Sequence, residues 1–145
     1  MVFRKNNSRS RAFILTLAKN NPNNLTNRNT IDTAQAFSVY NRKQFHHIFP
    51  EAFLRRAMPS AERSNLLNFC MLAAADNNLI SDRNPQDYLP ELIRDLGLHA
   101  DDVLHSNLMP AVDEYDYAAA ELITFFDARV EIVRREILRL CSGAH

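Results

Sequence analysis

The chain of 145 residues carries 17 Lys or Arg and 17 Asp or Glu, so its formal net charge is zero, and 46% of its residues are hydrophobic. This length corresponds to one domain or to a part of a larger protein, and it is sufficient to bury a hydrophobic core. No apolar run approaches the roughly 20 residues that a membrane-spanning helix needs. Residues 1–10 lack the apolar segment of a signal peptide. We therefore expect a soluble, cytoplasmic protein that does not interact with a membrane.

Cysteine and glycine are too scarce for several classes of site. Cys70 and Cys141 form no Cys-x-x-Cys pair, so neither a zinc ribbon nor a disulfide framework is indicated, and we expect Cys70 to be a buried apolar side chain. With only two glycines, the chain has no Gly-rich phosphate loop and no Gly-x-Ser-x-Gly nucleophile elbow. It also lacks the His-Glu-x-x-His sequence of a zincin.

The neutral net charge hides a strong division along the chain. Residues 1–65 carry eleven Lys or Arg against three Asp or Glu, whereas residues 66–145 carry six against fourteen. The basic half contains His46 and His47, as expected if a polyanion approaches these histidines. The alternative is that the two halves only neutralise each other where they meet.

The N-terminal part of the chain is predicted to hold one helix and one polar loop. Ser10 can cap a helix that ends near Lys19, and its apolar residues recur on one side. Six of the ten residues from Asn20 to Asn29 are asparagine, which favours turns over regular structure. Residues 31–40 fit either a helix or an extended approach to the next strand.

The stretch from Gln44 to Pro50 reads Gln-Phe-His-His-Ile-Phe-Pro and is predicted to be a short strand that ends at a catalytic loop. Aromatic and β-branched residues favour a strand, and the proline ends it. Neighbouring strand residues point to opposite faces, so His46 and His47 cannot have the same role. One imidazole can bind a metal ion while the other faces a substrate.

A short helix is predicted after this strand, from Glu51 to Met58. Arg55 and Arg56 lie at its far end, where the helix dipole favours cations. The alternative is that these two arginines contact phosphate groups.

Two candidate site residues follow in the next two elements. Leu66–Leu72 is predicted to be the second strand, with Asn68 inside an apolar run. Asn68 is either hydrogen-bonded in the interior or exposed at the start of the strand. Residues 73–80 are predicted to form a short helix that carries Asn77 beside Asp76.

The next helix is predicted from signals at both of its ends. Asn84 is suited to the N-cap and Pro85 to the first helical position. Pro90 is expected to divide this helix, and Gly97 is expected to end it. Arg83, directly before the helix, either binds a phosphate or is solvated.

The C-terminal part is predicted to be helical as well. A turn or short helix is expected at Ala100–Leu104, and the last helix is expected to run from about Glu114 to Cys141. An apolar stripe along this last helix is expected to pack in the core or against a partner, and it consists of Leu122, Phe126, Val130, Val133, Ile137 and Leu140.

Taken in order, these residues resemble the HNH or ββα-metal nucleases. In that family a strand ends in an acidic residue or histidine followed by histidine, an asparagine follows, and a short helix supplies a histidine or asparagine. Here the corresponding positions are His46-His47, Asn68 and Asn77. Residues 80–89, Ile-Ser-Asp-Arg-Asn-Pro-Gln-Asp-Tyr-Leu, are similar to the Asn-Lys-x-Pro-x-x-Tyr-Leu tail in the nuclease domain of GmrSD-type restriction proteins. The resemblance covers the middle third of the chain and extends to the flanks only loosely.

The resemblance implies a role for each of these residues. One divalent metal ion, Mg²⁺ in first place, with Mn²⁺, Ni²⁺ or Zn²⁺ as alternatives, would be held by His46 and Asn77. Asp76 is a rival ligand because a carboxylate is the better donor for a hard cation. His47 would be the general base, since a pKa of about 6.5 leaves imidazole neutral near physiological pH, and Asn68 would tie the loop between the two strands. The residues expected to bind nucleic acid are Arg42, Lys43 and Arg83.

The expected fold is therefore α+β and mainly α-helical, with a ββα-metal finger embedded in a helical domain. We expect a single nuclease domain over residues 1–145, with the finger core at about 40–82 and helical flanks at 10–19 and 84–141. This domain is either the C-terminal part of a larger protein or a dedicated subunit. The expected activity is hydrolysis of phosphodiester bonds in DNA, in the restriction of foreign or modified phage DNA. In GmrSD-type proteins the nuclease works with a nucleotide-dependent domain or subunit, so a sensor of this kind is a second expected partner.

Two other classes of protein are compatible with the sequence. A non-catalytic nucleic-acid-binding module would use the basic half and would bind DNA without cutting it. A helical interaction domain would hold His46 and His47 as satisfied core groups and would bind no metal ion.

Overall fold

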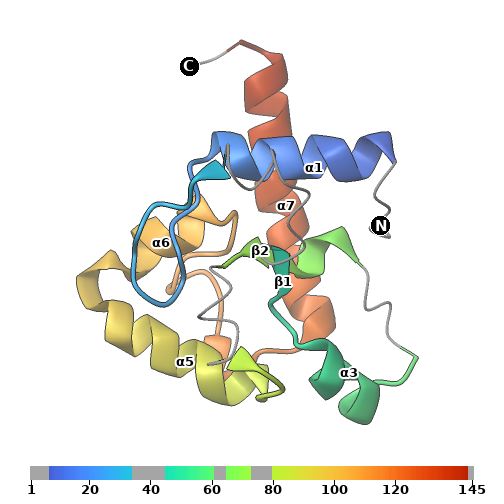
Figure 1. Cartoon of the computed structure of the whole chain (residues 1–145), viewed down its shortest axis with the longest axis vertical. Coiled ribbons are helices and arrows are strands. Elements are labelled where there is room, and N and C mark those ends of the chain that lie inside the picture. The colour runs from blue at the N-terminus through green and yellow to red at the C-terminus, as the bar shows by residue number, and fades with distance from the viewer. Residues whose placement is uncertain (1–6, 34–44, 61–64, 73–79, 144–145) are drawn as a thin grey trace.

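The computed structural model of the chain describes residues 7–33, 45–60, 65–72 and 80–143. The described part is mostly helical and contains one two-stranded antiparallel sheet, β1 (Phe45–His47) with β2 (Phe69–Met71), so the expected α+β class is confirmed. In these residues there is no helix with the length and hydropathy to cross a membrane. Figure 1 shows the small sheet near the centre of the molecule, with helices around it. The helices are α1 (Ser8–Lys19), α3 (Glu51–Ala57), α5 (Pro85–Leu96), α6 (Ala100–Ser106) and α7 (Leu122–Cys141), and the short 3₁₀ helices are η1 (Leu66–Asn68), η2 (Gly97–His99) and η3 (Tyr117–Ala119).

Helix α5 forms where the sequence places its start and stop signals. The Asn84 side chain accepts a hydrogen bond from the Gln86 backbone N–H at 3.1 Å, and Gly97 ends the helix with a positive φ of 57°. The prediction that Pro90 divides this helix is wrong, because α5 is continuous through it. One missing N–H removes only one hydrogen bond of the helix. The buried neighbours Tyr88 and Leu89 hold the helix in the core on either side of that gap.

Helix α1 begins earlier than predicted, and its cap is a different residue. Asn7, not Ser10, is the N-cap, and its side chain accepts a hydrogen bond from the Arg9 N–H at 2.8 Å. Ser10 instead lies buried on the inner side of the helix. Asparagine and serine are equally good caps, so the sequence alone could not choose between these two positions.

The segment predicted as one strand, Leu66–Leu72, is divided into two elements. Its first part is the 3₁₀ helix η1, which Asn65 caps by accepting a hydrogen bond from the Leu67 N–H at 3.0 Å. Only Phe69–Met71 forms β2. Asn68 therefore lies directly before the strand, and not within it.

The last helix also begins later than predicted. The Asp116 side chain accepts hydrogen bonds from the N–H groups of Ala118 and Ala119, which closes the separate turn η3, and α7 starts only at Leu122. Within the predicted stripe Val130 is 41% exposed, so it does not pack in the core of this chain. The buried side of α7 consists of Leu122, Phe125, Arg129 and Val133.

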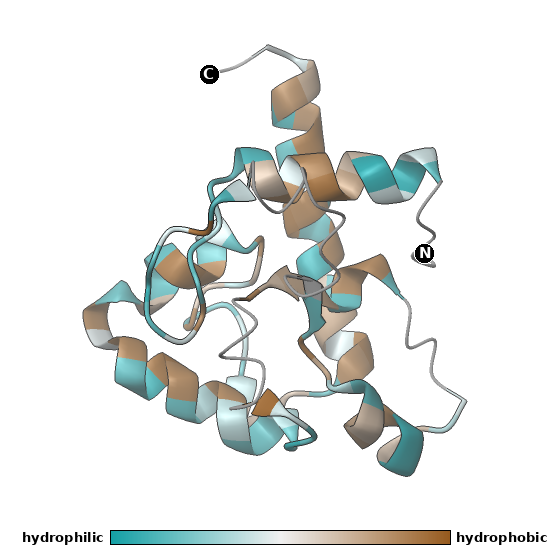
Figure 2. Ribbon diagram, viewed as in Figure 1, coloured by the Kyte–Doolittle hydropathy of each residue, from teal (hydrophilic) through white to brown (hydrophobic). Residues whose placement is uncertain are grey.

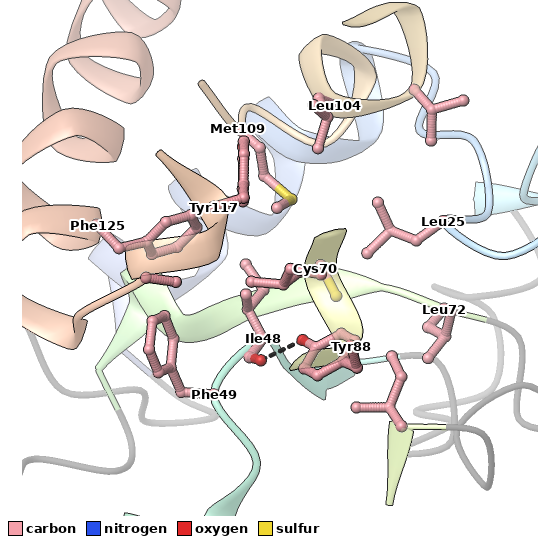
Figure 3. Close-up of a cluster of buried hydrophobic side chains, with 14 of the residues drawn as sticks. Leu25, Ile48, Phe49, Cys70, Leu72, Tyr88, Leu104, Met109, Tyr117 and Phe125 are labelled. Carbon is pink, nitrogen blue, oxygen red and sulfur yellow. Dashed lines mark hydrogen bonds between the residues drawn. The ribbon is translucent and has the colours of Figure 1, made fainter. Parts of the chain in front are cut away.

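The sheet lies between two hydrophobic clusters. The first cluster includes Ile48, Cys70, Leu72, Ile80 and Tyr88, and it is continued by residues of α5, α6 and α7 (Figure 3). The second cluster lies where α1 crosses α7, and its members include Phe13, Leu17, Leu66, Phe69, Met71 and Val133. Figure 2 shows brown and teal residues alternating along α5 and α7, as expected for helices with one buried side.

Candidate functional site

The two histidines of β1 leave the strand toward different clusters. His46 is paired with Cys70 and His47 with Phe69 in the antiparallel register. Because directly opposed residues place their side chains on the same face, His46 lies on the face of Cys70 and His47 on the face of Phe69. The His47 and Phe69 ring centroids are 4.5 Å apart, in agreement with this assignment. Both imidazoles are partly buried, and their placement on opposite faces agrees with the sequence analysis.

The turn Ile48–Pro50, directly after His47, is held by two side chains and one backbone group. The Ile48 N–H donates to the Asn68 backbone carbonyl at 2.8 Å. The Phe49 N–H donates to Asn68 Oδ1 at 2.7 Å, and Asn68 Nδ2 donates back to the Phe49 carbonyl at 3.0 Å. The Tyr88 hydroxyl donates to the Ile48 carbonyl (Figure 3). All four backbone polar groups of Ile48 and Phe49 are therefore hydrogen-bonded.

Asn68 is fully buried, so the alternative that it is exposed at the start of a strand is wrong. Its amide group uses both an acceptor and a donor on one residue, Phe49. Leaving a buried backbone group without its partner costs about 1–3 kcal/mol. Asn68 thus ties the segment before β2 to the turn after β1.

The proposed metal ligands are only partly within the described residues. Asn77 and its rival Asp76 lie outside them, and in the described part of the chain no three side chains of His, Cys, Asp or Glu gather in a group that could hold a metal ion. His46 lies on the face of the sheet where the first cluster packs. Leu72 and Ile80, which precede and follow residues 73–79 in the chain, both belong to that cluster.

Of the metal ligands that the resemblance implies, His46 is the one whose position is described, on β1.

The arginines near the site are paired with carboxylates at the surface. Arg83 lies 2.6 Å from Glu91, and its side chain is 40% exposed. Arg56 lies 2.8 Å from Asp82 and lowers the pKa of that carboxyl group, mainly through their hydrogen bond. Arg55 pairs with Glu51 at 2.6 Å within α3. The other two residues expected to bind nucleic acid, Arg42 and Lys43, lie outside the described residues.

Exposed ion pairs of this kind are screened by water and contribute little to stability. Of the three pairs, only Arg56 with Asp82 joins the basic half of the chain to the acidic half.

Cys70 is the buried apolar residue that the sequence analysis expects. Its side chain is fully buried opposite His46, and burial raises the pKa of the Cys70 thiol to about 12 although the Arg129 guanidinium acts in the opposite direction. The thiol is therefore neutral at physiological pH. Neutral thiols are poor nucleophiles and poor metal ligands.

Two residues that support the site were not among the predicted site residues. The resemblance includes Tyr88 only as the tyrosine of the Tyr-Leu tail, yet the Tyr88 hydroxyl donates a hydrogen bond to the Ile48 carbonyl. Arg129 is fully buried, and its Nη1 donates to the Leu67 carbonyl at 2.7 Å, directly before Asn68. The sequence gives only a weak signal for Arg129. This charged residue lies four positions after Phe125 and four positions before Val133, which are both on the buried side of the helix.

Comparisons with known protein families, with curated proteins and with solved structures found no match to this chain. The case for a function therefore depends on the chain's own residues, above all His46, His47 and Asn68.

Proposed function

We propose that this chain is a metal-dependent HNH-type endonuclease that hydrolyses phosphodiester bonds in DNA. The observation that supports this proposal most is the double hydrogen bond between Asn68 and Phe49, which fixes the turn directly after His47. A histidine at the end of a short strand, followed by a turn that a buried asparagine holds, is the arrangement expected for the general base of this family.

His47 is the proposed general base. Near physiological pH a neutral imidazole can accept a proton from the attacking water on a ring nitrogen. The ring packs against Phe69, and the backbone after it is held through Asn68, and both contacts restrict the movement of His47. Restricting a catalytic group before the reaction lowers the entropic part of the barrier.

His46 is the proposed metal ligand, together with Asn77 or Asp76. A bound divalent cation would neutralise the charge on the scissile phosphate and would stabilise the departing 3′ oxygen. Because His46 and His47 leave β1 on opposite faces, each imidazole keeps one role: one holds the cation, and the other accepts the proton. The products would carry 5′-phosphate and 3′-hydroxyl ends.

DNA is the proposed substrate, and the arginines around the site are the proposed contacts to its backbone. Arg83 could exchange Glu91 for a phosphate group, since their pair is exposed. Arg42 and Lys43 precede β1 in the sequence, with only Gln44 between them and the strand. Restriction of foreign or modified phage DNA, with a nucleotide-dependent sensor domain or subunit as partner, is the setting that the resemblance to GmrSD-type proteins implies.

The test is cleavage of supercoiled plasmid and of modified phage DNA by the purified chain with Mg²⁺, Mn²⁺, Ni²⁺ or EDTA. We expect cutting that requires the cation and falls by roughly a hundredfold or more in His47→Ala, because general-base catalysis contributes about 10²–10⁴-fold. His105→Ala is the matched control, since His105 is an exposed histidine on α6. This control should cut at the parental rate.

Each alternative result of this test would contradict one assignment or support a different function. Cutting by His47→Ala at the parental rate would contradict the general-base assignment. Binding to DNA that weakens with salt, without cleavage under any cation, would support a non-catalytic nucleic-acid-binding module. Neither metal binding nor cleavage would support a helical interaction domain.

A further inference from the structure

Tyr88 is a buried residue of α5 whose hydroxyl reaches the candidate site. Its side chain is 1% exposed and belongs to the first cluster, beside Ile48 and Cys70. Within this apolar surrounding the hydroxyl donates to the Ile48 carbonyl, which Figure 3 shows as a dashed line. A tyrosine inside a hydrophobic cluster normally needs such a partner, because an unpaired hydroxyl is costly to bury. Here the partner is the residue that follows His47.

We propose that Tyr88 is a positioning residue of the site, which fixes the peptide unit between Ile48 and Phe49, in the turn after His47, from the side of the core. This inference rests on the proposed function, and it adds to the site a residue from a different element, α5. Asn68 holds the same peptide unit from the side of β2.

This inference is supported by the two hydrogen bonds at the peptide unit between Ile48 and Phe49. Its carbonyl oxygen accepts from Tyr88, and its N–H donates to Asn68 Oδ1 at 2.7 Å. A peptide unit is planar, so two hydrogen bonds at its opposite ends fix its rotation about the chain. With the Tyr88 bond removed, only the Asn68 end would be held.

Rotation of this peptide unit would move the strand end that carries His47. The Ile48 N–H is bonded to the Asn68 carbonyl at 2.8 Å, so a shift of Ile48 would loosen one of the bonds that join the turn to Asn68 of η1. A misplacement of about 1 Å at a reacting group can cost roughly a hundredfold in rate. Tyr88 would thus act on the reaction through His47 without touching the substrate.

Tyr117 provides a matched control. It is also a buried tyrosine of the first cluster, 4% exposed, and its hydroxyl donates to the Pro110 carbonyl at 2.7 Å. Pro110 lies between α6 and η3, and within the described part of the chain it shares no hydrogen bond with the Ile48–Pro50 turn. Tyr88→Phe and Tyr117→Phe therefore each remove one hydroxyl and leave one carbonyl without its donor, but only the first affects the turn after His47.

The experiment measures Mg²⁺-dependent cleavage and amide hydrogen exchange in both variants. We expect Tyr88→Phe to lower kcat by roughly ten- to a hundredfold while KM for DNA stays within about twofold, because positioning affects the chemical step and not the contacts to DNA. We expect the Phe49 amide to exchange roughly tenfold faster in Tyr88→Phe. Tyr117→Phe should change neither kcat nor the exchange of Phe49.

Two results would overturn the inference while the proposed function stands: equal kcat values for the two variants in an active protein, and unchanged Phe49 exchange in Tyr88→Phe. A parental chain that cleaves no DNA with any cation would contradict the proposed function, and the catalytic role of Tyr88 with it. The two failures are therefore distinguishable by the activity of the parental chain.

Discussion

Buried polar side chains around β1 bind the backbone and not one another. Asn68 bonds to both polar groups of Phe49, and Tyr88 bonds to the carbonyl of Ile48. Backbone groups in a turn have no partners from regular secondary structure, so each must be satisfied in another way when the turn is buried. The neutral Cys70 thiol lies beside them in the same cluster.

The raised pKa of Cys70 predicts a component of stability that depends on pH. Burial raises this pKa from 9.0 to about 12, so the folded protein keeps the thiol proton at pH values where the unfolded chain loses it. The contribution is fully present below pH 9 and is lost as the pH rises toward 12. One group of this kind changes the free energy of unfolding by about 1.4 kcal/mol per pH unit in that window.

The measurement is urea unfolding at pH 8 and pH 10 under reducing conditions. Between these pH values, we expect the parental chain to lose about 1 kcal/mol more than Cys70→Ala. Cys141→Ala is the control, because Cys141 is the exposed cysteine at the end of α7, and it should show the parental pH dependence. Equal losses in the parental chain and in Cys70→Ala would show that the thiol proton is not retained by the fold.

At the scale of elements, short sequence signals predicted the elements whose position or end is indicated by neighbouring residues. The strand Phe45–His47, the cap at Asn84 and the stop at Gly97 are each indicated by residues within a few positions, and all three are found in the structure. The segment 73–79, which would complete the predicted finger with Asn77, lies outside the described residues. That part of the site therefore stays a prediction.

The structural features that the sequence could not predict depend on residues that are far apart in the chain. The run Leu66–Leu72 is apolar apart from Asn68, and the hydrogen bonds that hold Asn68 in η1 against the turn after His47 come from Ile48 and Phe49, about twenty residues away in the chain. The buried side of α7 contains Arg129 and not Val130, because the carbonyl groups that accept from Arg129 lie more than twenty residues away in the chain. Hydropathy along a helix cannot reveal such acceptors.

Pro90 lies in the interior of α5, and replacing it there should stabilise the fold. It has no N–H to donate to the Gln86 carbonyl, and its ring crowds the preceding turn. Pro90→Ala should restore this bond and raise the free energy of unfolding by about 1–2 kcal/mol, after the greater freedom of the unfolded chain is subtracted.

Pro85 provides the comparison within the same helix. It occupies the first helical position, where an N–H would have no partner in the helix. Pro85→Ala should therefore leave the stability unchanged or lower it slightly in the same urea titration. A loss of stability in Pro90→Ala would mean that the proline ring contributes more through packing than the missing hydrogen bond costs.

At the scale of the whole molecule, Arg129 connects α7 to segments from three other parts of the chain. Its Nε and Nη2 donate to the carbonyl groups of Leu108 and Asn107 at 3.0 and 2.8 Å, and its Nη1 donates to that of Leu67 at 2.7 Å. Its guanidinium carbon lies 5.7 Å from the centre of the Phe13 ring in α1. No carboxylate is bonded to it among the described residues. Burial lowers the pKa of Arg129 to about 10, so it still carries its charge at neutral pH.

Arg129→Lys tests whether this arginine determines the stability of the whole fold. A lysine keeps the charge, but its compact ammonium group cannot reach three carbonyl groups that a planar guanidinium spans. We expect the free energy of unfolding to fall by about 3 kcal/mol, since buried carbonyl groups lose their donors. For a domain of this size the thermal midpoint should fall by roughly 6–12 °C.

Arg134→Lys on the same helix is the matched control. Arg134 is exposed and lies 3.6 Å from Glu131, so this change should alter the stability by less than about 0.5 kcal/mol. The Arg129 variant should also show faster exchange of the Phe49 amide, because Leu67, which Arg129 holds, directly precedes Asn68. If Arg129→Lys lost stability without this change at Phe49, Arg129 would hold the helices together independently of the turn after His47. If both changed, the C-terminal helix would be a support of the candidate site.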